Sequence, residues 1–182
     1  MISIPPIKFR IVIRKKETTH LFAKDITGDI VKGRQEVVIN WRAGQLIMDE
    51  PSFNGGKDIG PDPFTAILSG LATCTITTLR MYIRRKGWDI TDIHIAVNMQ
   101  QRLEPFQTMI DRTIFFGQQV SDEQKERLLY IAKNCPVARL LQGAILIDTD
   151  LSDDKSARAG RGTYPPIDDA AVVVTQDYPE QL

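Results

Sequence analysis

The residues best suited to chemistry in this 182-residue chain are its two cysteines, Cys74 in "GLATCTITTLRMY" and Cys135 in "AKNCPVARLLQ". A thiolate is a nucleophile and a reductant, and two thiols that meet can form a disulfide. A lone cysteine on an apolar helix face is more often a small core residue. Here the second cysteine stands directly before a proline, and the presence of both cysteines in this context favours a redox pair.

A structural disulfide between Cys74 and Cys135 is the third alternative. Closing a loop of that length could contribute about 4 kcal/mol. The start of the chain lacks the apolar core and cleavage site of a secretory signal, so we expect a cytoplasmic protein with reduced thiols. That expectation counts against the structural disulfide.

A long helix must position Cys74. Asp62 is a suitable N-cap, Pro63 suits the first helical position, and Gly87 can take the left-handed turn at the end. Apolar and small residues recur between them at helical spacing, which predicts that Cys74 points inward. The members of this face are Phe64, Ile67, Leu68, Leu71, Cys74, Thr75, Thr78 and Tyr82.

A break between two helices must position Cys135. Ser121 and Gln124 form a capping box that opens one helix, and Gly143 closes the second. Because Pro136 cannot continue the first helix, we expect Cys135 at the N-cap of the second. The free N–H groups there favour a thiolate.

Alternating apolar segments predict the strands. They run from Phe9, over residues 35–41 and 44–51, over 92–100 and 108–116 as a hairpin, and over 144–151. The predicted fold class is therefore α+β, with antiparallel sheets and a long central helix. We find no internal repeat.

Composition excludes several classes of function. Lysine and arginine balance aspartate and glutamate at 23 each, so no positive excess indicates nucleic acid or an anionic membrane surface. No window is expected to span a bilayer. His20 and His94 have no metal-ligand spacing to each other or to the cysteines, so we expect no metal site and no cofactor.

Two stretches resemble a known family. "GPDPFTAILSGLATCTITTLRMYIRRKGW" and "RTIFFGQQVSDEQKERLLYIAKNCPVARLLQGAILIDTDL" are similar to the OsmC/Ohr group, the osmotically inducible and organic hydroperoxide resistance proteins. The resemblance covers residues 28–151. It leaves 1–27 as an N-terminal strand extension and 152–182 as an irregular C-terminal tail.

The resemblance implies an OsmC-like fold that forms an intertwined homodimer with two active sites at the subunit interface. It also implies thiol peroxidase chemistry. Cys74 would attack an organic hydroperoxide, Cys135 would resolve the sulfenic acid to a disulfide, and a small or protein-bound dithiol reductant would recycle it. Phe64, Ile67 and Leu71 near Cys74 would form an apolar substrate pocket.

The sequence departs from the family pattern at one position. Members with demonstrated peroxidase activity carry a glutamate just after an N-P or S-P step, and an arginine from the early hairpin region. Here the helix opens Asp62-Pro63-Phe64-Thr65, without a glutamate. The arginine is Arg34 or Arg42, and Arg34 lies closer to the expected distance before Pro51.

Two functions therefore stand at this stage. The first is a Cys-based peroxidase, which the retention of both thiols favours. The alternative is a non-catalytic dimer that binds a small apolar ligand or senses redox state, which the missing glutamate favours. We predict the peroxidase.

Overall fold

The computed structural model of the chain describes residues 26–143 together with 145, 147, 149 and 151. Contacts divide these residues into two compact units. One holds 26–30, 37–46 and 151, and the other holds the described residues among 31–36 and 47–149. The predicted segment boundaries after residues 27 and 151 stay predictions.

The first unit is built on an antiparallel arrangement of short strands. β1 (Thr27–Ile30) pairs antiparallel with β2 (Val37–Trp41), so that Ile30 lies opposite Val37. β3 (Gly44–Met48) is the next strand of the sheet, in the order β1-β2-β3. The strands predicted over 35–41 and 44–51 are found at Val37–Trp41 and Gly44–Met48, and the strand expected from Phe9 lies outside the described residues.

The central helix of the second unit is α1 (Pro63–Lys86), which follows the short 3-10 helix η1 (Ser52–Asn54). The Asp62 carboxylate accepts hydrogen bonds from the backbone N–H groups of Phe64 and Thr65, at 2.9 and 3.1 Å. Gly87 ends the helix in the left-handed region, with φ 63°. The predicted start and end of this helix are therefore confirmed.

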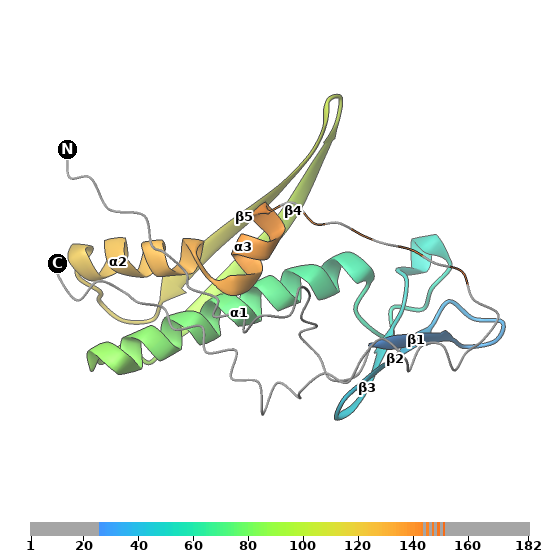
Figure 1. Cartoon of the computed structure of the whole chain (residues 1–182), viewed down its shortest axis with the longest axis horizontal. Helices are drawn as coiled ribbons and strands as arrows, with labels where there is room; N and C mark the ends of the chain where they lie inside the picture. Colours follow the sequence, from blue (N-terminus) through green and yellow to red (C-terminus); the bar gives the residue numbers. More distant parts are fainter. Residues whose placement is uncertain (1–25, 144, 146, 148, 150, 152–182) are drawn as a thin grey trace, which may run out of the picture. The chain divides into compact units, whose positions relative to one another are not determined.

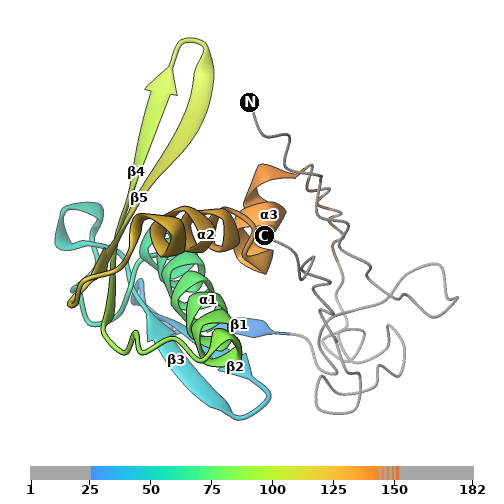
Figure 2. The same cartoon turned by 90° about the vertical axis from the view of Figure 1, so that its left-hand side faces the viewer.

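A hairpin and two helices pack on α1. β4 (Ile93–Leu103) and β5 (Phe106–Phe116) pair antiparallel over their whole length, with the turn at Glu104 and Pro105. α2 (Asp122–Lys133) and α3 (Pro136–Gln142) lie on the same side of α1, and the turn of the hairpin extends beyond the helices (Figure 1, Figure 2). α1 contacts β4, α2 and α3.

The core of this unit lies between α1 and α2. Its fully buried side chains come from both helices and from the start of α3, and they include Leu79, Ile83, Leu128, Ile131, Thr75 and Cys135. The capping box of Ser121 and Gln124 is formed as predicted. The mixed architecture with antiparallel sheets confirms the α+β fold class.

Three sequence expectations need correction. Phe64 and Ile67 were expected to face inward but are 56% and 44% exposed, because the buried part of α1 begins at Leu71, which clusters with Cys135 and Ala138. The strand expected over 144–151 is not found at residues 145, 147, 149 and 151, which are the described part of that segment. The third expectation, that no stretch of the chain could span a bilayer, is wrong for α1.

α1 is long and apolar enough to cross a membrane by length and composition, contrary to our expectation. The central helix of a soluble protein meets the same criterion. α1 buries Leu71, Leu79, Tyr82 and Ile83, whereas other apolar side chains of the helix, such as Met81, are exposed.

Replacing Leu128 with alanine should destabilise the fold. Leu128 is 1% exposed, so the substitution leaves a cavity, and we expect a loss of about 2–5 kcal/mol in the free energy of unfolding. Leu129→Ala is the matched control, because Leu129 is 51% exposed on the same helix. Urea unfolding of both variants checks this, and equal losses would contradict the described core.

Candidate functional site

The break between α2 and α3 places Cys135 in the core. Pro136 is the first residue of α3 and Cys135 is its N-cap, as the sequence predicted. The Cys135 N–H donates to the Ala132 carbonyl at 3.3 Å, and the Cys135 carbonyl accepts from the Arg139 N–H at 3.0 Å. The Cys135 side chain is 0% exposed. The backbone on both sides therefore fixes a thiol that solvent does not reach.

Cys74 approaches Cys135 from α1. Both cysteines are free thiols, and Cys74 is half-buried. Cys74 packs against the buried cluster of Leu71, Cys135 and Ala138, as does Val137, the second residue of α3. The predicted pair therefore meets in the structure, with Cys74 as its more accessible member.

The environment of Cys74 disfavours its charged form. Burial raises the pKa of the Cys74 thiol above its ordinary value, against an opposing hydrogen bond from Val137. The neighbouring Cys135 raises that pKa further, and Thr78 lowers it. Two adjacent thiols seldom ionise together, since a second negative charge is repelled by the first.

Arg112 is the cation beside the pair. It lies on β5, opposite Val97 of β4. One terminal nitrogen donates to Thr75 Oγ1 at 2.7 Å and lies 3.7 Å from Cys135 Sγ, and the other donates to the Ala132 carbonyl at 2.8 Å. Arg112 thus connects β5 with α1 and with the end of α2.

Sequence reasoning missed Arg112 and Thr75. The signal for Arg112 was present, because Ile110, Arg112 and Ile114 share one phase of an alternating strand, and that phase is the less exposed one. A charged residue in an apolar phase requires a polar partner in the interior. The signal for Thr75 was also present, because it is a polar residue on the face of the helix that was predicted to point inward.

The predicted arginines lie elsewhere in the chain. Arg34 is in the loop between β1 and β2, where it forms an ion pair with Glu36 at 3.6 Å. Arg42 is in the turn between β2 and β3. Their assignment to Cys74 stays a prediction.

The predicted substrate-pocket residues divide into two kinds. Leu71 is 4% exposed and clusters with Cys135 and Ala138, with Cys74 packed against this cluster. Phe64 and Ile67 lie on α1 with more than two fifths of their side chains exposed. Their role in a pocket also stays a prediction.

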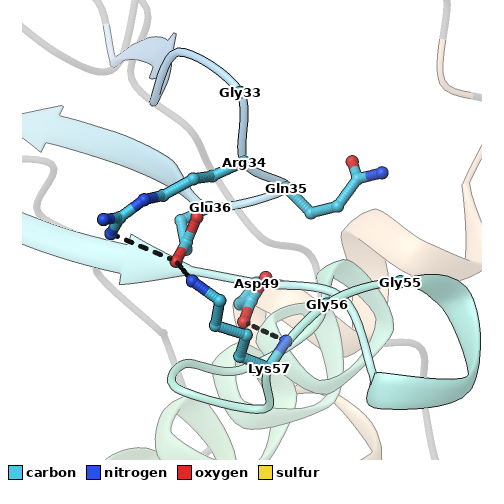
Figure 3. A pocket seen from close by; sticks show the side chains of 8 residues that line it. All are labelled: Gly33, Arg34, Gln35, Glu36, Asp49, Gly55, Gly56 and Lys57. Carbon is cyan, nitrogen blue, oxygen red and sulfur yellow. Dashed lines mark hydrogen bonds and ion pairs between the residues drawn. The ribbon is translucent and has the colours of Figure 1, made fainter.

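A polar pocket of about 290 Å³ contains Arg34 (Figure 3). Lys57 donates to Glu36 Oε1 at 3.1 Å, and the Glu36 side chain is 4% exposed. Within the described chain, Glu36 Oε2 is a buried oxygen without a hydrogen-bond partner. The other lining residues are Gly33, Gln35, Asp49, Gly55 and Gly56.

Asp49 organises one wall of this pocket. Its carboxylate accepts from the N–H groups of Lys57 at 2.8 Å, Glu50 at 2.9 Å and Ile59 at 3.4 Å. Burial opposes ionisation of Asp49, but these backbone hydrogen bonds hold its pKa below the ordinary value. Within the described residues, no three metal-binding side chains come together.

Comparison with known proteins identifies relatives of this chain. The family described as OsmC-like protein matches residues 55–150. No curated protein matches the chain.

Several solved structures are similar. One, from Psychrobacter arcticus and named for the osmotic stress induced and detoxification response, is 21% identical, covers 69% of this chain and 91% of that chain, and has a TM-score of 0.57. An OsmC like protein from Mycoplasma pneumoniae is 24% identical, with 66% and 87% covered and a TM-score of 0.56. An organic hydroperoxide resistance protein from Legionella pneumophila is 17% identical, with 65% and 90% covered and a TM-score of 0.51. At these identities the likeness shows the fold.

Alkylation by iodoacetamide should report the raised pKa of Cys74. Because Cys135 is inaccessible, the reaction of the reduced protein reports Cys74, and we expect its rate to keep rising with pH beyond the point where the cysteine of a short unstructured peptide reaches its plateau. Cys74→Ser should abolish the reaction. A plateau at lower pH than that of the peptide would contradict the described environment.

Proposed function

Because the chain belongs to the OsmC-like protein family, we propose that it is a Cys-based thiol peroxidase that reduces organic hydroperoxides. The observation that carries this proposal is the packing of Cys74 against the cluster that holds Cys135, two free thiols of unequal accessibility. Contact is what disulfide formation requires, and the accessible member is the one that an external peroxide can reach.

The proposed reaction has two steps. The Cys74 thiolate attacks the terminal oxygen of the hydroperoxide, the O–O bond breaks, and the alkoxide leaves and takes a proton to become the alcohol. Cys74 is then a sulfenic acid. The Cys135 sulfur attacks Cys74 Sγ and displaces hydroxide, which takes a proton to become water, so the two thiols are oxidised to one disulfide.

A dithiol reductant completes the proposed cycle. Its thiolate attacks Cys74 Sγ, Cys135 leaves, and the resulting mixed disulfide is resolved by the second thiol of the reductant. A small or a protein-bound dithiol satisfies this chemistry. The proposal assigns the protein to the cytoplasm, where the thiol pool is kept reduced.

Apolar side chains beside Cys74 support an organic substrate. Ile67 is two helical turns before Cys74 on α1, and Phe64 is three residues further back, so both lie toward the same face of the helix. Both side chains are substantially exposed. Leu71 is buried, in the cluster against which Cys74 packs. An alkyl group of the peroxide would be bound here, whereas hydrogen peroxide has none.

We also propose a homodimer, intertwined as in the family. Within the described residues, large apolar side chains are exposed on several elements, including Phe53 at 86%, Met81 at 69% and Phe106 at 71%. Monomeric proteins rarely expose extensive apolar surface. Light scattering on the purified protein should give the mass of two chains, and a mass of one chain would contradict the dimer.

The alternative is a non-catalytic dimer that binds a small apolar ligand or senses redox state. The raised pKa of Cys74 favours it, since this environment leaves less thiolate at neutral pH. The absence of a glutamate at the start of α1 points the same way.

A single-turnover experiment separates the two functions. Reduced protein receives one equivalent of cumene hydroperoxide, and intact mass follows both thiols. If the protein is a peroxidase, both of its thiols should be oxidised much faster than the thiol of free cysteine under the same conditions. Cys135→Ser should accumulate a sulfenic acid on Cys74 that dimedone traps, and Cys74→Ser should stay unmodified.

The same experiment with hydrogen peroxide tests the substrate class. We expect a slower reaction than with cumene hydroperoxide, because only the latter makes apolar contacts. If neither peroxide oxidises the two protein thiols faster than it oxidises free cysteine, the peroxidase proposal fails and the ligand-binding alternative is retained.

A further inference from the structure

We propose that Arg112 is a positioning residue that aligns the two cysteine-bearing segments and so raises the effective concentration of Cys135 at Cys74. The effective concentration measures how much more readily two thiols of one molecule form a disulfide than two separate thiols do. This inference rests on the proposed function, because it concerns the step that joins the two cysteines. It can nevertheless be measured without any peroxide.

The first argument is the place of the two Arg112 contacts in the chain. One terminal nitrogen donates to Thr75 Oγ1 at 2.7 Å, and the other donates to the Ala132 carbonyl at 2.8 Å. Thr75 directly follows Cys74 on α1. The Ala132 carbonyl also accepts from the Cys135 N–H at 3.3 Å. One guanidinium therefore connects the residue beside the first thiol with the backbone group that holds the second.

The second argument is that both ends of this connection are fixed. The Thr75 side chain is buried, and its hydroxyl donates to the Leu71 carbonyl at 2.7 Å, so its oxygen has a set orientation on α1. Arg112 lies within the long strand β5, opposite Val97 of β4. A planar guanidinium that donates from both terminal nitrogens has little freedom to turn. The connection therefore sets the distance between α1 and the end of α2 beside the cysteines.

The third argument comes from the apolar packing around the thiols. Cys135 clusters with Leu71 and Ala138. The partly buried side chains packed on this cluster are Cys74, Val97, Ile110, Val137 and Leu141. Apolar contacts are not directional, so they tolerate small shifts of α1 against the break between α2 and α3. Hydrogen bonds require defined distances and angles, and Arg112 supplies them here.

A high effective concentration serves the resolving step of the proposed cycle. Once Cys74 has become a sulfenic acid, the Cys135 sulfur must reach Cys74 Sγ before a second hydroperoxide oxidises the sulfenic acid to a sulfinic acid. Segments that are already aligned lose less entropy in that encounter. Arg112 acts here through Thr75 and the Ala132 carbonyl.

The test is the equilibrium of the purified protein with glutathione. Each Cys74–Cys135 disulfide that forms reduces one glutathione disulfide to two glutathione thiols. The ratio of oxidised to reduced protein at known glutathione concentrations therefore gives the effective concentration. Acid quenching and alkylation of the unfolded protein with N-ethylmaleimide separate the two forms by intact mass. Cys135→Ser should form only a mixed disulfide with glutathione.

Arg112→Gln is the informative variant, because glutamine can hydrogen-bond one of the two partners but cannot connect both. We expect an effective concentration about tenfold lower than that of the wild type, which corresponds to about 1.4 kcal/mol. This is at the low end of the contribution of a hydrogen bond to a charged group.

Arg127→Gln is the matched control. Arg127 also connects α2 with α1, because its Nε donates to the Tyr82 hydroxyl at 3.0 Å. It lies about two helical turns before Cys135 in the chain. Arg127→Gln should lower the stability of the fold and keep the wild-type effective concentration.

Three results would overturn the inference. An unchanged effective concentration in Arg112→Gln would mean that its contacts do not align the thiols. An equal decrease in Arg127→Gln would mean that general loosening of the helices is sufficient. An increase in Arg112→Gln would mean that the guanidinium acts by its charge. Its Nη1 lies 3.7 Å from Cys135 Sγ, and a cation there favours the reduced form, in which a thiolate can exist.

Thr75→Val tests the same connection from α1, since valine has nearly the same shape and cannot accept the hydrogen bond. It should also lower the effective concentration, whereas Thr75→Ser, which keeps the hydroxyl, should stay near the wild type. Thr75 Oγ1 also lies 3.4 Å from Cys135 Sγ, so the double variant with Arg112→Gln isolates the shared contact. Its decrease should be smaller than the product of the two single decreases. If Arg112→Gln does not fold, equal values for the valine and serine variants would overturn the inference.

The proposed function and this inference fail separately. Thiols inert toward cumene hydroperoxide, combined with a lower effective concentration in Arg112→Gln alone, would reject the peroxidase and retain the positioning role. Rapid peroxide reduction, combined with an effective concentration that does not depend on Arg112, would retain the peroxidase and reject that role.

Discussion

Pro136 has no N–H to continue the hydrogen bonding of α2, and the turn that it forces places the thiol of Cys135 where α1 and β5 meet. Arg112 fixes this junction from the β5 side through Thr75 and the Ala132 carbonyl. The hairpin, the central helix and the two following helices therefore share one polar contact inside an apolar core. Its position determines which sulfur faces a cation and which faces the surface.

The two thiols consequently have unequal environments. Cys74 is half-buried and is not among the hydrogen-bond partners of Arg112, whereas Cys135 is inaccessible and lies 3.7 Å from the guanidinium. A peroxide requires access, and a resolving thiol requires only the neighbouring sulfur. The arrangement thus gives each cysteine the surroundings that one step of the proposed cycle needs, although burial makes the first step depend on activation of Cys74.

Local signals in the sequence were sufficient for the elements that hold the cysteines. Asp62, Gly87, Ser121 and Pro136 act through neighbouring backbone groups, so helix ends and the break at Cys135 could be predicted. The exposure of Phe64 and Ile67 could not be predicted in this way. Helical periodicity identifies which face of a helix is apolar, but it does not show how much of the helix other elements cover. Arg112 was missed because its partners are 20 residues or more away in sequence. Its position on the apolar face of β5, in phase with Ile110 and Ile114, was the available signal.

The central claim is that Cys74 and Cys135 form a redox pair within one chain. Heavy-isotope and natural protein are unfolded, mixed and refolded together so that dimers contain both, and peptide mapping under non-reducing conditions after one equivalent of an organic hydroperoxide then tests the claim most directly. The account predicts a Cys74–Cys135 linked peptide in which both halves carry the same isotope, formed in proportion to the hydroperoxide consumed. Mixed-isotope links, or consumption of hydroperoxide that leaves both thiols intact, would contradict it.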